Sequence, residues 1–293
     1  MNEEGVLVNQ IKLNLRSEGM KKVLTIAGSD CSGGAGIQAD LKTFSAQGVF
    51  GMSVITAVTA QNTQGVFDVQ DISPEIIGKQ IDAIFQDIEV DALKIGMVSQ
   101  IASIEIICKK LEQYSPKNIV LDPVMISKSG FSLLQPVAKK KLIEKLLPKC
   151  DLLTPNLPEA EAILEEVLGH KFKIDTIEEM IVAAKEIYKL GPKYVLIKGG
   201  HLEGKAIDIL FDGKEITYFN CERIPTKNTH GTGCTLSSAI AANLSLGNPI
   251  IESVKIAKEY ITIAIEHSLD IGKGVGPTNH FYSLYKKAGM KYE

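Results

Sequence analysis

Short apolar segments alternate with amphipathic segments along most of the chain. The apolar segments are rich in Val, Ile and Leu, which is typical of buried strands. They lie at Val23–Ala27, Ser53–Thr59, Leu93–Ile95, Asn118–Asp122, Leu152–Thr154 and Tyr194–Ile197. Helical spacing of apolar residues predicts helices at Ile37–Ala46, Pro74–Phe85, Ile101–Leu111, Pro136–Leu147, Pro158–Leu168 and Ile177–Leu190. Strands that alternate with helices form βαβ units, so the pattern predicts an α/β fold with a largely parallel sheet.

The alternation changes towards the carboxyl terminus. Two β-rich segments, Ile207–Phe211 and Ile216–Phe219, flank an Asp-Gly pair, which predicts a hairpin. Two helices are expected after it, at Cys234–Leu246 and Ile251–Ser268, separated by a Gly-Asn-Pro turn. No repeat and no linker divides this pattern, so we expect a single domain.

Composition narrows the function classes. The chain has 293 residues, of which 45% are hydrophobic, and a formal net charge of -3. Its lysines do not cluster into a basic patch that would bind nucleic acid, and no apolar segment is long enough to span a membrane. Its five cysteines include no C-x-x-C pair, which favours a reducing cytoplasm over a disulfide framework or zinc site. His201, His230 and His280 lack metal-ligand spacing, and we expect them to be loop or hydrogen-bonding residues.

A glycine-rich turn precedes one of the predicted helices. Gly231, Thr232, Gly233 and Cys234 lead into a segment of small and apolar residues. A helix amino terminus offers free N–H groups and a positive dipole end, which suit an anion and lower the pKa of a thiol. The pattern therefore predicts a phosphoryl-transfer site with Cys234 as nucleophile or base. A plain turn followed by a core helix with a small buried cysteine is the alternative.

A second glycine-rich loop spans Gly28 to Gly36. It lacks the Lys-Ser/Thr pair of a P-loop, because Gly34 and Ala35 occupy those places. It also lacks the acidic residue that follows a dinucleotide fingerprint about twenty positions later. The loop is therefore expected to serve a different ligand.

Polar residues follow several predicted strands. In open parallel sheets, ligands bind beyond the carboxyl ends of the strands. Carboxylates there suit Mg²⁺ and a lysine suits phosphate. The residues at these positions are Gln61, Asn62, Met97, Asp122, Asn156, Glu159 and Lys198. Each one alone could equally be a helix cap or a solvated loop residue.

Several motifs together resemble the hydroxymethylpyrimidine/phosphomethylpyrimidine kinases of thiamine biosynthesis, a branch of the ribokinase-like superfamily. They are AGSD at 27–30, SGGAGIQADLKTF at 32–44, AQNT at 60–63, KIGM at 94–97, LDPVM at 121–125, TPN at 154–156 and HGTGCT at 230–235. The resemblance covers about Met20 to about Tyr285. Thr59 is a departure, because an apolar residue often occupies that position.

The resemblance implies a role for each of these positions. The fold would be a single-domain ribokinase-like three-layer sandwich at 20–293, after an extension at 1–19. The implied catalytic residues are Gly231, Thr232, Gly233 and Cys234, where most ribokinase relatives end this loop with an Asp base. The substrate-binding residues would be Gly28, Asp40, Gln61, Met97 and Val124. The nucleotide would contact Lys198, Asn156 and Thr229, the metal would contact Glu159 and Asp122, and Ser127–Gln135 would form a flap.

The resemblance also implies a reaction. The chain would use Mg²⁺ and ATP to phosphorylate 4-amino-5-hydroxymethyl-2-methylpyrimidine, and then its monophosphate, to the diphosphate. The expected partner is a small-molecule pyrimidine, with no nucleic acid or membrane partner, in a cytoplasmic protein that forms a homodimer. Two alternatives stay open: a pyridoxal or pyridoxine kinase of the same fold, and a non-catalytic pyrimidine-binding protein. Lys198, Glu159 and Cys234 are all present, which argues against the non-catalytic reading.

Overall fold

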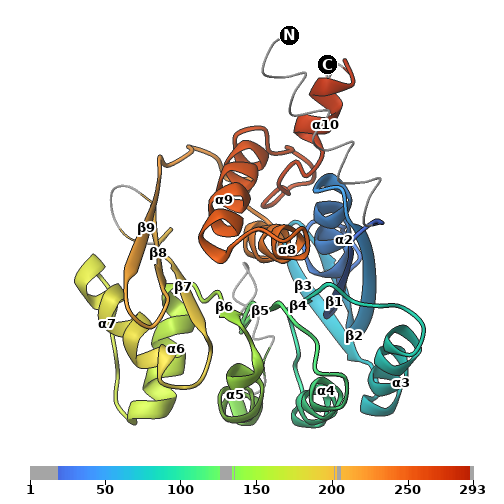
Figure 1. Ribbon diagram of the computed structural model, residues 1–293. Coiled ribbons are helices and arrows are strands. Elements are labelled where there is room, and N and C mark those ends of the chain that lie inside the picture. Colours follow the sequence, from blue (N-terminus) through green and yellow to red (C-terminus); the bar gives the residue numbers. More distant parts are fainter. Residues whose placement is uncertain (1–18, 126–133, 135, 201, 203–205, 291–293) are drawn as a thin grey trace.

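The computed structural model describes residues 19–125, 134, 136–200, 202 and 206–290. Within them, one nine-stranded sheet has the order β3-β2-β1-β4-β5-β6-β7-β8-β9 (Figure 1). The strands are β1 Lys22–Asp30, β2 Phe50–Asn62, β3 Gly65–Asp71, β4 Ala92–Ile95, β5 Ile119–Leu121, β6 Leu152–Leu153, β7 Tyr194–Lys198, β8 Ala206–Phe211 and β9 Ile216–Cys221. β1, β2, β4, β5, β6 and β7 are mutually parallel, and the remaining pairs are antiparallel.

Helices cover both faces of the sheet. They are α2 Gly36–Ala46, α3 Pro74–Phe85, α4 Ile101–Tyr114, α5 Pro136–Lys141, α6 Leu157–Leu168, α7 Ile177–Tyr188, α8 Thr232–Ser245, α9 Ile250–Glu266 and α10 Tyr282–Lys287. α3 to α7 lie below the sheet in Figure 1, and α2, α8 and α9 lie above it. Each layer has its own apolar core against the sheet. The predicted α/β class and largely parallel sheet are confirmed.

The buried elements follow the apolar pattern closely. α3 has the predicted bounds, with Ser73 as its amino-terminal cap and Pro74 in its first turn. β1 and β2 are longer than predicted, because they pair with each other as far as Asp30 and Thr59, and β2 continues to Asn62 through its pairing with β3. Strand pairing carries β1 to Asp30, through residues that were expected to be loop. Gly28, Ser29 and Asp30 thus belong to a strand because the neighbouring strand β2 pairs with it, and local sequence does not reveal that pairing.

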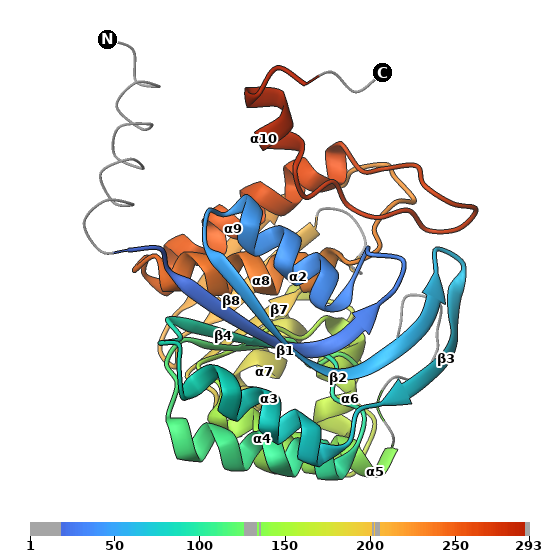
Figure 2. The ribbon, with the colours of Figure 1, turned by 90° about the vertical axis from the view of Figure 1, so that its right-hand side faces the viewer.

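Three local features were not predicted. β3 pairs antiparallel with β2 alone at the sheet edge, and all seven of its residues are partly buried or exposed, in an irregular order. Figure 2 shows the β2–β3 hairpin projecting from the sheet. The helix expected over Pro136–Leu147 changes at Leu142–Leu146 into π-helix and then into a 3₁₀ turn. α10 was also absent from the sequence prediction.

Two expectations lie outside the described residues. These are the extension at 1–19, of which the structure describes only Gly19, and the flap at Ser127–Gln135, of which it describes only Leu134. Among the described residues, no helix is long and apolar enough to cross a membrane.

Candidate active site

One cavity of about 530 Å³ lies beyond the carboxyl ends of the parallel strands. Its walls come from the ends of β1, β2 and β7, the loops after β4, β5 and β6, and the first turn of α8. Thirteen of the fourteen residues singled out from the sequence border it: Gly28, Gln61, Met97, Asp122, Val124, Asn156, Glu159, Lys198, Thr229, Gly231, Thr232, Gly233 and Cys234. The sheet thus brings together motifs that are up to about two hundred positions apart in the chain.

Asp40 is the exception. Its side chain is fully buried on α2 and does not border the cavity. Its two carboxylate oxygens accept hydrogen bonds from Thr25 Oγ1 and Ser238 Oγ, both at 2.7 Å, and from Lys94 Nζ at 2.9 Å. The contact between Asp40 and the substrate that the sequence predicts stays a prediction, because the observed partners of Asp40 are all protein side chains. These partners show that Asp40 holds Lys94.

Lys94 is the main residue that the sequence analysis missed. It lies on β4, has no exposed surface, and still borders the floor of the cavity. Burial by itself lowers the pKa of Lys94, but the charges of Asp40, Cys234 and Asp122 outweigh burial and raise it. Lys94 is therefore a permanent buried cation. A lysine inside a short apolar strand was the only signal in the sequence, and it did not reveal which residue would pair with it.

A second lysine–aspartate pair lies further along the same floor. Lys198, at the end of β7, donates to Asp122 Oδ1 at 2.8 Å, and Thr154 donates to the same oxygen at 3.2 Å. Burial lowers the pKa of Lys198, but Asp122 and Glu159 together raise it. This cation borders the cavity and is 14% exposed, so it can reach an anionic ligand.

Asn156 and Glu159 form the start of α6. The Asn156 side chain accepts from the Glu159 backbone N–H at 2.9 Å, and Glu159 Oε2 accepts from the Asn156 N–H at 2.8 Å. This is a capping box, so the helix-cap alternative is correct as a description of the local geometry. Burial raises the pKa of Glu159 above its usual range, and Lys198 opposes the shift. Both residues also border the cavity, so the cap does not exclude a role towards a ligand.

The predicted anion-binding turn opens α8. Gly231 has a φ of 78°, a left-handed conformation that favours glycine. A side chain there would also collide with the backbone carbonyl of Gly34. The turn therefore needs glycine both for its backbone conformation and for its close contact with the loop after β1.

The structure corrects the expected acidity of Cys234. Burial raises the pKa of this thiol to about 11, and the charge of Lys94 opposes burial without cancelling it. The helix dipole was expected to lower this pKa. Burial was not visible in the sequence, and it exceeds the dipole effect. At neutral pH Cys234 is therefore a thiol in the unliganded structure.

A contact between distant loops was also missed. His230 Nε2 lies 2.8 Å from Asp30 Oδ2, and the Gln61 amide nitrogen lies 3.3 Å from the same Nε2. Burial raises the pKa of Asp30, but hydrogen bonds from His230 and Ser32 outweigh it and lower this pKa to about 2. A carboxylate only accepts, so His230 Nε2 must carry the hydrogen, and it offers Gln61 no acceptor. The Gln61 amide N–H groups therefore have no acceptor on His230, while the Gln61 Oε1 accepts from Thr59 Oγ1 at 3.2 Å.

Comparisons with known proteins agree with this geometry. Residues 30–279 match the family model described as phosphomethylpyrimidine kinase. The hydroxymethylpyrimidine/phosphomethylpyrimidine kinase of Rhizobium meliloti (strain 1021) is 50% identical over 266 residues, which cover 90% of this chain and 98% of that protein. The chain belongs to the phosphomethylpyrimidine kinase family. It is therefore a kinase, that is, a phosphotransferase.

Solved structures place the fold in the ribokinase-like group. A phosphomethylpyrimidine kinase from Clostridium difficile is 53% identical with a TM-score of 0.74, and the match covers 84% of this chain and 99% of that one. An ADP complex of the Bacillus subtilis pyridoxal kinase is 41% identical with a TM-score of 0.82, covering 91% and 99%. The predicted ribokinase-like fold is confirmed, and both the pyrimidine and pyridoxal branches lie close to this chain.

Proposed function

We propose that this kinase transfers the γ-phosphoryl group of ATP to 4-amino-5-hydroxymethyl-2-methylpyrimidine and then to the resulting monophosphate. One observation carries the proposal: a single cavity is bordered by Gly28, Gln61 and Met97 from β1, β2 and the loop after β4, and also by Lys198 of β7 and the first turn of α8. We propose the first group as a slot for the pyrimidine ring and the second as a cationic site for the phosphates. The family match and the ADP complex of a related structure support ATP as the phosphoryl donor.

Gly28, Gln61, Met97 and Val124 are proposed to hold the pyrimidine. A side chain at Gly28 would come within 3.1 Å of Met97 Sδ, so glycine keeps this slot open for a flat ring. The aminopyrimidine edge presents a ring-nitrogen acceptor beside an amino donor. The Gln61 amide offers the complementary pair, as it does when Gln reads adenine.

Lys198, Asn156, Thr229 and the turn from Gly231 to Cys234 are proposed to hold the phosphates. The partly exposed Lys198 ammonium supplies positive charge, and the first turn of α8 supplies backbone N–H groups. Charge develops on the phosphoryl oxygens during transfer, so donors fixed in advance lower the barrier. Catalysis here is then mainly positioning and electrostatic stabilisation.

Glu159 and Asp122 fit a magnesium ion bound together with ATP. In the described residues, no cluster of three or more His, Cys, Asp or Glu could hold a metal by itself. Mg²⁺ commonly takes only one or two carboxylates and completes its shell with phosphates and water. The metal would neutralise charge on the β- and γ-phosphates. Two neighbouring carboxylates beside Lys198 match that requirement.

Pyridoxal kinase is the second candidate function, because a pyridoxal kinase structure aligns at a TM-score of 0.82. Pyridoxal carries a methyl group beside its ring nitrogen and no amino donor, so it leaves half of the Gln61 amide unpaired. A buried polar group left without its partner lowers affinity and rate. This argument favours the pyrimidine as the main substrate.

Three further expectations stay proposals. We propose a kinase domain at 20–293 preceded by an extension at 1–19, a homodimer, and a cytoplasmic location. Light scattering would measure the assembly state.

An ADP-release assay with Mg-ATP tests the proposed function. The hydroxymethylpyrimidine, its monophosphate and pyridoxal are offered separately at matched concentrations. We expect turnover of both pyrimidines, with pyridoxal slower. Faster turnover of pyridoxal than of either pyrimidine would contradict the proposal, and so would the absence of turnover with all three.

A further inference from the structure

Two segments that lie far apart in the chain carry the two parts of the proposed site. The loop from Asp30 to Ala35 follows Gly28 of the pyrimidine slot and leads into α2. The turn that opens α8 begins directly after His230 and is proposed to hold the phosphates. α2 and α8 contact each other in the upper layer of Figure 1. An acceptor oxygen in the slot reaches the γ-phosphorus only when these two segments are aligned.

The carboxylate of Asp30 fixes the shape of the first segment. Its Oδ1 accepts hydrogen bonds from the Ser32 N–H at 2.9 Å and from the Ser32 hydroxyl at 2.7 Å. Its Oδ2 accepts from the N–H groups of Gly34 at 3.2 Å and Ala35 at 2.9 Å. These donors all lie within five residues of Asp30, which is 3% exposed. The carboxylate is therefore held in place by its own loop.

A donor from the second segment also reaches this carboxylate. His230 Nε2 lies 2.8 Å from Asp30 Oδ2, and the two residues are 200 positions apart in the chain. The backbones meet at the same place. A Cβ on Gly34 would overlap the His230 ring, and a Cβ on Gly231 would overlap the Gly34 carbonyl oxygen. The loop and the turn are therefore in direct contact, and the His230–Asp30 hydrogen bond is a buried polar link between them.

The backbone of His230 is held separately from its side chain. The His230 N–H donates to Gly276 O at 3.0 Å, and the His230 carbonyl accepts from the Thr278 N–H at 3.4 Å. The Gly276 N–H in turn donates to Asn228 Oδ1 at 3.0 Å. A substitution of the His230 side chain therefore removes the link to Asp30 and leaves these backbone contacts in place.

We propose that His230 is a positioning residue whose hydrogen bond to Asp30 aligns the pyrimidine slot with the phosphate-binding turn. The rate of transfer between two bound groups depends steeply on their alignment, and an error of about 1 Å can cost about 100-fold. Each ligand still binds without the link, because Gly28 and Lys198 lie on β1 and β7, which the sheet holds. The link therefore acts on kcat and not on affinity. This inference rests on the proposed function and applies to both phosphorylations.

Two substitutions of His230 separate the link from the rest of the side chain. Glutamine carries an amide nitrogen close to the place of Nε2 and can donate to Asp30, whereas asparagine is one carbon shorter. His230→Asn should lower kcat on both pyrimidine acceptors by about 10- to 100-fold, and His230→Gln should recover most of that loss. His170→Asn is the matched control, because this exposed histidine contacts Leu168 O at 3.2 Å outside the cavity.

Calorimetric titration measures the two affinities separately. The hydroxymethylpyrimidine alone and a nonhydrolysable ATP analogue alone should each bind His230→Asn with a Kd within a few-fold of wild type. Normal binding of both ligands also shows that the variant is folded. A residue with a merely structural role would weaken the binding of at least one ligand together with the rate.

A double-mutant cycle identifies the partner of His230. Asp30→Ala removes the acceptor of the link, so adding His230→Asn to it should lower kcat only slightly further. Losses that add in full would show that the two residues act independently, and would overturn the link.

The other outcomes separate this inference from the proposed function. An unchanged kcat in His230→Asn would overturn the inference, and so would equal losses in His230→Gln and His230→Asn. A loss of affinity as large as the loss in kcat/KM would make His230 a ligand-binding residue and overturn its positioning role. Wild-type protein that phosphorylates neither pyrimidine would refute the proposed function itself, before any variant is compared.

Discussion

The two lysine–aspartate pairs of the cavity floor use the same residue types and differ in burial. The pair that joins β4 to α2, Lys94–Asp40, has side chains that are 0% exposed, and Asp40 accepts two further hydroxyl hydrogen bonds. The pair at the ends of β7 and β5, Lys198–Asp122, has exposed fractions of 14% and 3%. The Lys94–Asp40 pair has no exposed surface and borders the cavity through Lys94 alone. The open pair can exchange its partner for an incoming phosphate or metal ion.

We propose that this difference in exposure makes Lys198 the ligand-binding cation of the two. An ammonium group that reaches the cavity, such as that of Lys198, can exchange its ion pair with a carboxylate for one with a substrate anion. The number of ion pairs then stays the same, so the exchange costs little free energy. A charge with no exposed surface stays paired inside the protein, as Lys94 does with Asp40. Five experiments can break or sharpen the comparison.

The largest expected effect concerns stability. Asp40→Asn leaves Lys94 as a buried charge without a charged partner, and should lower the free energy of unfolding by about 3–5 kcal/mol. Asp122→Asn should lower it by less than half as much, because water reaches Lys198. Urea denaturation of the two variants measures the difference. Equal losses would show that the two pairs are energetically alike and would remove the basis of the comparison.

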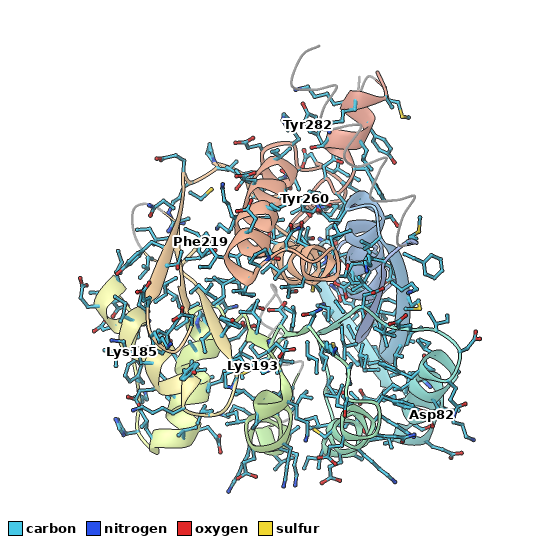
Figure 3. All side chains as sticks on the ribbon, in the orientation of Figure 1. Asp82, Lys185, Lys193, Phe219, Tyr260 and Tyr282 are labelled. Atoms are coloured by element: carbon cyan, nitrogen blue, oxygen red, sulfur yellow. The ribbon has the colours of Figure 1, made fainter. Side chains whose placement is uncertain are left out.

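Lys198→Met should lower kcat on both pyrimidine acceptors by about 10²- to 10³-fold, because one fixed positive charge at the transferred phosphoryl group is lost. Lys193→Met is the control. Lys193 pairs with Asp151 at the surface, where its side chain is 73% exposed (Figure 3). A loss on only one acceptor, or an equal loss in the control, would contradict a shared phosphate site.

Glu159→Gln should lower kcat by about 10- to 100-fold and raise the Mg²⁺ concentration needed for half-maximal rate. Affinity for the pyrimidine should hardly change, because Glu159 is proposed to bind the metal ion and not the pyrimidine. A Mg²⁺ titration of the rate, with Glu166→Gln on the same helix as control, measures both effects. Full turnover of Glu159→Gln at ordinary Mg²⁺ would exclude Glu159 as a metal-binding residue.

Gln61→Met should lower kcat/KM on the pyrimidine by about 1–3 kcal/mol, because the aminopyrimidine edge loses its paired amide. Activity on pyridoxal should stay level or rise. Steady-state kinetics with the pyrimidine and with pyridoxal measure both changes in kcat/KM. Parallel losses would mean that Gln61 serves mainly to support Thr59 and His230, with which it is in contact.

The smallest effect concerns the acidity of Cys234. Its pKa is raised to about 11, so the reactive thiolate is scarce at neutral pH and becomes commoner as pH rises towards that value. Alkylation of Cys234 should therefore accelerate about tenfold per pH unit between about pH 7 and 9. Mass spectrometry of the peptide that contains Cys234 measures the alkylation rate. Substitution of the exposed Cys31 removes a competing alkylation site. A rate that levels off below about pH 8 would contradict the raised pKa.

Much of the fold could be predicted because the parallel strands are buried on both faces. Such strands must be continuously apolar, and the helices that cover them must repeat apolar residues at helical spacing, so each element leaves its own pattern. β3 left no such pattern, because an edge strand with little burial is defined by its pairing with β2. The change to π-helix at Leu142–Leu146 likewise has no signal in local spacing.

The sequence by itself determined the strand–helix order, the glycines that make the turn before α8 possible, and the motif set that indicates the family. These depend on local spacing, backbone conformation and residue type, which the chain carries along its length. Only the tertiary structure decided that Lys94 pairs with Asp40, that Asp40 does not border the cavity, and that Cys234 is a thiol of raised pKa. Charge pairing and acidity depend on burial and on neighbours that are far apart in the chain, such as Asp30 and His230, which are 200 positions apart, and only folding brings these together.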